Sequence, residues 1–117
     1  MQAVIREYLR DEAQFDEAGN VVSRGNPFGV MMASLKEGKL AFGFSQCHER
    51  DNFDKKLGNV IASNRLEQFD PTVEEVLIVP ADMVEMMERF VERAQRYFRA
   101  STNIRVLNGF ILSTNHY

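Results

Sequence analysis

Two short apolar segments separated by a glycine stand out in the first half of the chain, at residues 28–35 and 40–47. Glu37-Gly38 lies between them, and glycine adopts the positive φ angles of a tight turn at no steric cost, so the pattern predicts a β-hairpin. Large and small side chains alternate in the second segment, which indicates one bulky face and one face that another backbone can approach closely. The large residues are Leu40, Phe42 and Phe44, and the small ones are Ala41, Gly43 and Ser45.

Helical periodicity follows over residues 51–69. An apolar stripe recurs at the spacing of one helix face, Asp51 is a candidate N-cap, and Pro71 predicts the end of the helix because the residue before proline avoids the α region. Gly58 would be explained by tight packing on the small face of the hairpin, because glycine inside a helix costs up to about 1 kcal/mol relative to alanine. The stripe instead predicts packing against the bulky face. It consists of Phe53, Leu57, Val60 and Ile61.

A second helix, the longest in the chain, is predicted after a short strand at residues 73–79 that Pro80 closes. Asp82 is positioned to open this helix, with Glu85 three residues later as its capping-box partner. Apolar residues recur along it at helical spacing, which predicts one buried face. That face consists of Met83, Met87, Phe90, Ala94, Tyr97 and Phe98.

The first twelve residues fit two patterns. Val4, Ile5, Tyr8 and Leu9 have the spacing of a helix, whereas Ile5, Glu7 and Leu9 alternate as in a strand. Residues 16–26 are rich in turn formers and read as a connector.

At the other end of the chain, residues 104–107 and 110–113 flank Asn108-Gly109. This dipeptide between apolar runs predicts a hairpin, because a type I′ turn needs positive φ at both central positions. A length of 117 residues fits one domain, residues 1–117. The expected fold is therefore α+β, with a small antiparallel sheet packed against two main helices and a C-terminal hairpin.

Charge is unevenly distributed along the chain. The net charge is −3, and residues 89–117 carry five arginines and one glutamate, or +4, which leaves −7 for residues 1–88. This asymmetry favours an anion site near the C-terminus or complementary self-association, although helix ends also prefer cations on their own account. Cys47 is the single cysteine, no apolar run is long enough to cross a membrane, and the first residues do not form a signal peptide. We therefore expect a protein of the reducing cytosol.

Six basic residues on the two predicted helices are the candidate ligand-binding groups. Lys55 and Lys56 fall in the first turns of one helix, where cations oppose the helix dipole unless an anion is bound there. The second helix carries three arginines at i, i+4 and i+7, and guanidinium groups bind phosphate bidentately. Two alternatives remain open: Asp51 and Asp54 balance the lysines, and ion pairs Glu85–Arg89 and Glu92–Arg96 form along the second helix. The six candidates are Lys55, Lys56, Arg65, Arg89, Arg93 and Arg96.

Catalytic and metal-binding motifs are absent from the sequence. Cys47-His48 is accompanied by only one other histidine, His116, so a zinc site lacks ligands and a thiol nucleophile lacks a placed base. No phosphate-binding loop, dinucleotide fingerprint or paired-carboxylate pattern is present. We expect no catalytic residue, no metal and no cofactor, and therefore no enzyme.

A motif around the first predicted helix resembles one found in a group of small proteins encoded by tailed bacteriophages. The resemblance extends over residues 26–99 and includes an arginine-aromatic end at residues 92–98. The motif positions are Cys47, Asp51, Phe53, Lys55, Lys56, Gly58, Ile61, Ala62 and Arg65. Such proteins commonly act by binding, and the resemblance implies a counter-defence protein that sequesters cyclic nucleotide or cyclic ADP-ribose signals in the host bacterial cytosol.

The sequence thus favours a non-enzymatic protein that binds a phosphate-bearing nucleotide. We expect a homo-oligomer, since a pocket between subunits would surround one ligand with two sets of arginines, and we expect no membrane partner. The alternative is a protein inhibitor that binds a host defence or nucleic-acid-processing enzyme through its acidic front half, and an unrecognised nuclease or hydrolase is a third possibility.

Overall fold

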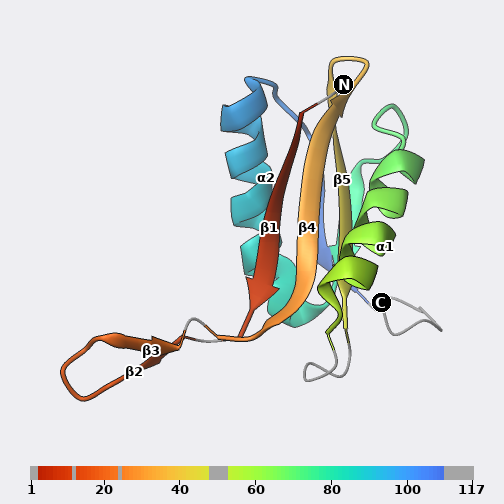
Figure 1. Ribbon diagram of the computed structural model, residues 1–117. Helices are drawn as coiled ribbons and strands as arrows, with labels where there is room; N and C mark the ends of the chain where they lie inside the picture. The colour runs from red at the N-terminus through yellow and green to blue at the C-terminus, as the bar shows by residue number, and fades with distance from the viewer. Residues whose placement is uncertain (1–2, 12, 24, 48–52, 110–117) are drawn as a thin grey trace.

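A three-stranded antiparallel sheet with one helix on each face forms the body of the molecule (Figure 1). The computed structural model describes residues 3–11, 13–23, 25–47 and 53–109. The strands are ordered β1-β4-β5, and the helices are α1 (Lys55–Gln68) and α2 (Val84–Phe98). The predicted α+β architecture, with an antiparallel sheet and two main helices, is confirmed.

The predicted hairpin forms strands β4 (Pro27–Lys36) and β5 (Lys39–Gln46). Their last paired residues are Lys36 and Lys39, so Glu37 and Gly38 alone make the turn. Both have positive φ, at 50° and 78°, as a two-residue type I′ turn requires. Because the turn fixes the register, large and small side chains of β5 alternate strictly between the two faces of the sheet.

The bulky face of the sheet packs against α2. Phe42 lies edge-on to Phe90 of α2, with 6.4 Å between ring centroids, and Met83 and Met87 are fully buried in the same core. The predicted apolar face of this helix is confirmed for Met87, Phe90 and Ala94, whereas Tyr97 is largely exposed. A 3-10 turn, η2 (Ala81–Met83), precedes α2, and the helix begins without a side-chain cap, so the predicted capping box is not formed.

The small face of the sheet packs against α1 at very short range. A Cβ added at Gly43 would lie 2.4 Å from the carbonyl oxygen of Ala62, and Ser45 Oγ donates a 2.8 Å hydrogen bond to the carbonyl of Gly58. The buried residues of the helix are therefore Gly58, Ala62 and Leu66.

Packing of the bulky strand face against the apolar stripe of α1 was a wrong expectation. Leu57 and Val60 of that stripe are 45% and 50% exposed. Small residues decided the helix orientation, because a glycine and an alanine opposite another glycine let the two backbones approach. The helix also begins later than predicted, with Asp54 as its N-cap accepting from the Leu57 amide at 3.1 Å. The candidate cap Asp51 lies outside the described residues.

The N-terminal segment is a strand, β1 (Val4–Arg10), and the helical alternative was wrong. Ile5 and Leu9 are buried in the core shared with α2, which matches the alternating pattern. The intervening side chains of Arg6 and Tyr8 face α1 on the other side of the sheet. Pairing with β4 overrides helical spacing here because β1 completes the sheet.

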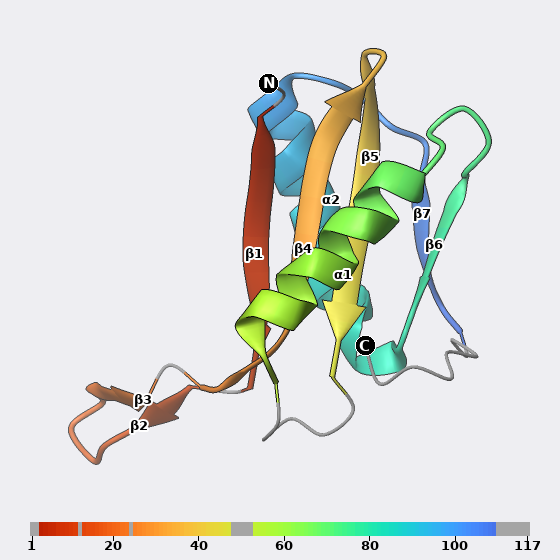
Figure 2. The same cartoon turned by 45° about the vertical axis from the view of Figure 1, so that its right-hand side comes forward.

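A two-stranded ribbon interrupts the connection between β1 and β4, where a connector was expected. Strands β2 (Gln14–Phe15) and β3 (Val21–Ser23) pair antiparallel and project away from the body (Figures 1 and 2). We name the ribbon, residues 13–23, the arm.

The C-terminal strand pair differs from the predicted hairpin. Strand β7 (Arg105–Asn108) pairs in parallel with β6 (Val76–Val79), and α2 connects the two (Figure 2). A helical crossover of this kind is the ordinary way to join parallel strands. The second half of the predicted hairpin, residues 110–113, lies outside the described residues. Among the helices of the described residues, none is long and apolar enough to span a membrane.

Candidate anion-binding site

The six basic residues predicted to bind a ligand are divided between the two faces of the sheet. Lys55, Lys56 and Arg65 belong to α1, and the three arginines of the predicted stripe belong to α2, which lies on the opposite face (Figures 1 and 2). Within one chain the sheet separates the two groups. One molecule therefore does not bring all six around a single ligand.

The arginines of α2 are exposed, and one of them is paired. Arg93 Nη1 lies 2.9 Å from Glu7 Oε2 of β1, so this arginine ties the helix to the sheet edge. The pairs Glu85–Arg89 and Glu92–Arg96, expected along the helix, are not among the ion pairs of the described residues. Arg89 and Arg96 thus remain available at the surface.

Arg65 has a structural role in the described contacts. Its Nη1 donates a 2.9 Å hydrogen bond to the carbonyl oxygen of Phe44, on the edge of β5 that does not pair with β4. The side chain is half-buried, and loss of hydration lowers the pKa of the guanidinium from its usual value. Arg65 therefore fastens α1 to the sheet edge.

A cluster of cations surrounds Tyr8 between β1 and the first turns of α1. Lys55 Nζ lies 5.0 Å from the centroid of the Tyr8 ring, and Arg10 Cζ lies 5.9 Å from the same centroid. Both are within the range of a cation–π contact. Arg6, two residues before Tyr8 on the strand, adds a third cation on the side that faces α1.

Asn59 holds this cluster together. Its Oδ1 accepts a 2.6 Å hydrogen bond from Arg6 Nη1, while its Nδ2 donates to the Tyr8 hydroxyl at 3.1 Å and to the carbonyl of Lys55 at 2.7 Å. The amide thereby orients Arg6 and Tyr8 relative to the helix. We name the surface formed by Arg6, Tyr8, Arg10, Lys55 and Asn59 the basic surface.

The basic surface adjoins a shallow groove of about 430 Å³ at Arg6 and Asn59. Ser63 and Asn64 add polar groups, and no carboxylate lines the groove. Its remaining walls are Val4, Met32 and Val60. A groove lined by one guanidinium, a hydroxyl and two amides offers hydrogen-bond partners for an anionic or polar ligand.

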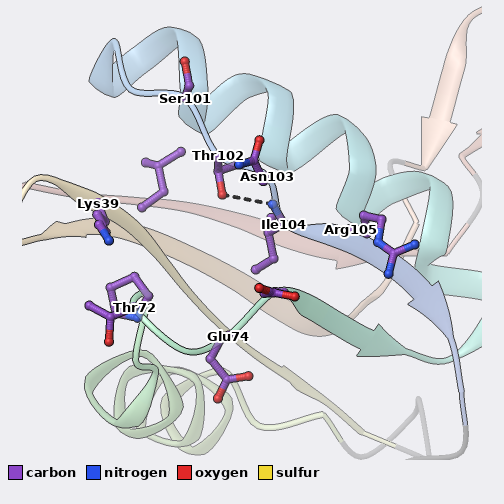
Figure 3. Close-up of a pocket in the computed structure, with 11 residues that line it drawn as sticks. Lys39, Thr72, Glu74, Ser101, Thr102, Asn103, Ile104 and Arg105 are labelled. Atoms are coloured by element: carbon purple, nitrogen blue, oxygen red, sulfur yellow. Dashed lines mark hydrogen bonds between the residues drawn. The ribbon is translucent and has the colours of Figure 1, made fainter.

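A larger groove of about 520 Å³ lies between the start of β5, at Lys39 and Leu40, and residues 71–75 and 101–105. Lys39 and Arg105 lie at opposite ends of this groove (Figure 3), and Glu74 and Glu75 line it as well, so two cations and two carboxylates cancel. Near its middle, Thr102 Oγ1 accepts a hydrogen bond from the Ile104 amide. This balance of charge makes it a weaker anion site than the basic surface.

Two further grooves carry no excess of positive charge. In one of about 420 Å³, Lys36 is outnumbered by Glu37, Glu67 and Asp70. In the other, of about 440 Å³ between β5 and β6, Arg65 is opposed by Glu74. Among these four grooves, the one at the basic surface is the best suited to an anion.

Lys55 was predicted from its place in the first helix, whereas its partners on β1 were not predicted. Arg6, Tyr8 and Arg10 occupy every second position, which places them on one face of a strand but spreads them around a helix. Reading residues 1–12 as a strand would have aligned two arginines and a tyrosine opposite the first helix.

No metal centre is formed by the part of the chain that the structure describes, since it contains no group of three or more His, Cys, Asp or Glu side chains arranged to hold an ion. Cys47 is buried. The chain matches no protein-family model, no curated protein sequence and no solved structure.

Proposed function

We propose that this protein binds a phosphate-bearing nucleotide at the basic surface and sequesters it without chemical conversion. The observation that carries the proposal is the convergence of Arg6, Arg10 and Lys55 around Tyr8 and Asn59. In their described contacts these cations face an aromatic ring, an amide and a backbone carbonyl, and no carboxylate.

An anion would relieve the electrostatic cost of this arrangement. Three like charges gathered on one small surface repel one another, and each exposed cation–π contact stabilises the arrangement by only about 0.5–1 kcal/mol. The start of α1 adds the partial positive charge of a helix N-terminus beside Lys55. A bound phosphate would accept charge-assisted hydrogen bonds from these groups, which are stronger than neutral ones.

The same residues match the other parts of a nucleotide. An aromatic ring such as that of Tyr8 provides a face on which a base can stack, and the Asn59 amide carries both a donor and an acceptor. The basic surface contains no carboxylate, histidine or thiol, which are the usual groups for proton transfer or nucleophilic attack near neutral pH. Its chemistry therefore favours binding over catalysis.

The resemblance to small phage proteins supplies the biological setting of the proposal. A protein that sequesters a cyclic nucleotide or cyclic ADP-ribose signal would suppress a host defence response in the bacterial cytosol. This setting depends on the motif at residues 47–65, whereas nucleotide binding depends on the basic surface. The two parts can be tested separately.

Calorimetric titration with cyclic di- and trinucleotides, cyclic ADP-ribose isomers and short oligonucleotides tests the binding. Salt at about 150 mM screens non-specific attraction between exposed charges. Replacing Arg6 and Lys55 together by glutamine should raise the Kd at least tenfold, because each charge-assisted contact is worth on the order of 1.5–3 kcal/mol. The melting temperature should change little, since exposed pairs contribute about 0–1 kcal/mol.

A matched control replaces Arg89 and Arg96 of α2 by glutamine, which makes the same change of charge on the opposite face. This control should keep the affinity of the native chain. Loss of binding in the control with full binding in the Arg6 and Lys55 variant would move the site to α2. A native chain that binds none of these ligands would refute the proposal.

A further inference from the structure

The arm contributes no residue to the hydrophobic core. Strands β1 and β4 pair up to Arg10 and Pro27, and a short turn there would have joined them. The chain instead makes a long excursion, and every residue between 11 and 26 whose exposure is described is at least partly exposed. The arm is therefore not explained by the packing of the body.

The arm is nevertheless a defined structure. Asp16 Oδ1 accepts hydrogen bonds from the amides of Ala18 and Asn20 at 3.0 and 2.8 Å, and Gly19 takes the positive φ of 84° that the turn needs. At its base, Arg10 Nη1 donates to the Gly25 carbonyl at 3.2 Å. These bonds define the turn of the ribbon and link the two chain segments at its base.

The arm presents three large apolar side chains to solvent. Phe15, Val21 and Val22 are 61%, 57% and 65% exposed. A two-stranded ribbon is only marginally stable by itself in water, and clustered exposed apolar side chains mark a surface that another molecule covers. The charged side chains beside them, Asp16 and Glu17, are both acidic.

We propose that the arm docks on a second copy of this chain, at the C-terminal end of α2. Tyr97 at that end is 58% exposed, and its ring centroid lies 4.9 Å from that of Phe98. The same end carries the exposed cations Arg96 and Arg99. An acidic, apolar ribbon matches an aromatic, basic helix end in both charge and apolar character.

The two surfaces cannot meet within one chain. The arm leaves the body at the end of β1, whereas α2 runs to the opposite end of the molecule, near the start of β1 (Figure 1). Two chains related by a two-fold axis would place each arm on the helix end of the other. One self-complementary contact would then be made twice and would close as a dimer.

Sedimentation equilibrium of the full chain tests this interface, with a dimer as the expected result. Replacing Phe15 and Val22 by serine should weaken the dimer at least about tenfold, because these side chains supply much of the apolar area that would be buried. The core remains intact in this variant, so its circular dichroism should match that of the native chain, and its melting temperature should fall only by the stabilisation that the dimer contact provides. A monomeric native chain, or an unweakened dimer of the double variant, would overturn the proposal.

A charge exchange identifies the two partner surfaces. Glu17→Lys and Arg96→Glu should each weaken self-association, and a mixture of the two variants should restore it, because each arm then faces an opposite charge. A mixture that associates no better than either variant alone would show that the arm does not dock at Arg96. No ligand is added in these experiments, so their outcome is independent of nucleotide binding.

Discussion

The two faces of the central sheet are packed in opposite ways. Toward α2 the sheet presents large side chains, and Phe42 and Phe90 meet there in a core free of polar side chains. Toward α1, strand β5 presents alanine, glycine and serine beside Val30 and Met32 of β4, and Gly43 lies directly under the helix backbone. The same strand, β5, contributes to both arrangements with alternate residues.

This difference shows two ways of attaching a helix to a sheet. The α2 face is stabilised by removal of apolar area from water, worth roughly 25 cal/mol per Å². The α1 face buries a smaller apolar cluster that includes Val30, Met32 and Leu66. It adds polar contacts: Ser45 to the Gly58 carbonyl, Arg65 to the Phe44 carbonyl and Lys36 to the Phe69 carbonyl. Mutations on the α2 face should therefore act mainly through lost apolar burial, and mutations on the α1 face through overpacking or lost hydrogen bonds.

The largest effect is expected from Phe42→Ala on the α2 face. Removing a fully buried aromatic ring leaves a cavity and should lower the free energy of unfolding by about 3–5 kcal/mol. Urea denaturation measures this change. Leu57→Ala on α1 is the control, and it should cost below about 1 kcal/mol because surface positions contribute little. Equal effects of the two changes would contradict the assignment of the faces.

Gly43→Ala should have the next largest effect and acts by overpacking. The added Cβ would lie 2.5 Å from the Leu66 amide nitrogen, so α1 must move away from the sheet. Insertion of a methyl group into a close-packed contact typically costs about 1–3 kcal/mol.

Gly58→Ala provides the comparison for Gly43→Ala. Its Cβ would meet mainly the Phe53 ring, a side chain that can move, and alanine favours the helix by up to about 1 kcal/mol. Thermal denaturation should therefore show a clear loss of stability for the first change and a smaller one, or none, for the second. A reversed order would mean that the helix approaches the sheet elsewhere.

The smallest effect is expected from Arg65→Met, which keeps the side-chain stem and removes the hydrogen bond to the Phe44 carbonyl. We expect a loss of about 1 kcal/mol, since the group is half exposed and solvent screens part of the interaction. Nucleotide affinity should stay unchanged, which separates this structural arginine from the ligand-binding role first predicted for it. Arg89→Met, on an exposed position, should leave the stability unaltered.

Several elements of the fold could be predicted from local patterns. The β4–β5 hairpin followed from Glu37-Gly38, and α2 followed from its periodic apolar face. The orientation of α1 could not be read from hydrophobicity, because Gly58 and Ala62 are buried while Leu57 and Val60 are half exposed. Small residues contribute weakly to an apolar stripe even where they form the closest contact.

Long-range strand pairing explains why the C-terminal strands and the basic surface differ from the predictions made from the sequence. Strand β7 joins β6 across the whole length of α2, and the turn signal at Asn108-Gly109 does not reveal such a partner. For the same reason, only part of the basic surface was predicted from the sequence. Lys55 was identified from its place in the helix, but Arg6 and Tyr8 join it only after β1 has paired with β4.

The asymmetry of the sheet has a consequence for the order in which the protein is synthesised. All three strands and α1 lie within the first 68 residues, so a nascent chain can complete that layer before α2 exists. Domains fold as the chain emerges, N-terminal parts first. Until residues 83–94 follow, the bulky face that α2 will cover, with Phe28 and Phe42, stays exposed to solvent. The partly synthesised chain thus exposes its most aggregation-prone apolar surface, and it depends on rapid synthesis of α2 or on chaperones to avoid aggregation.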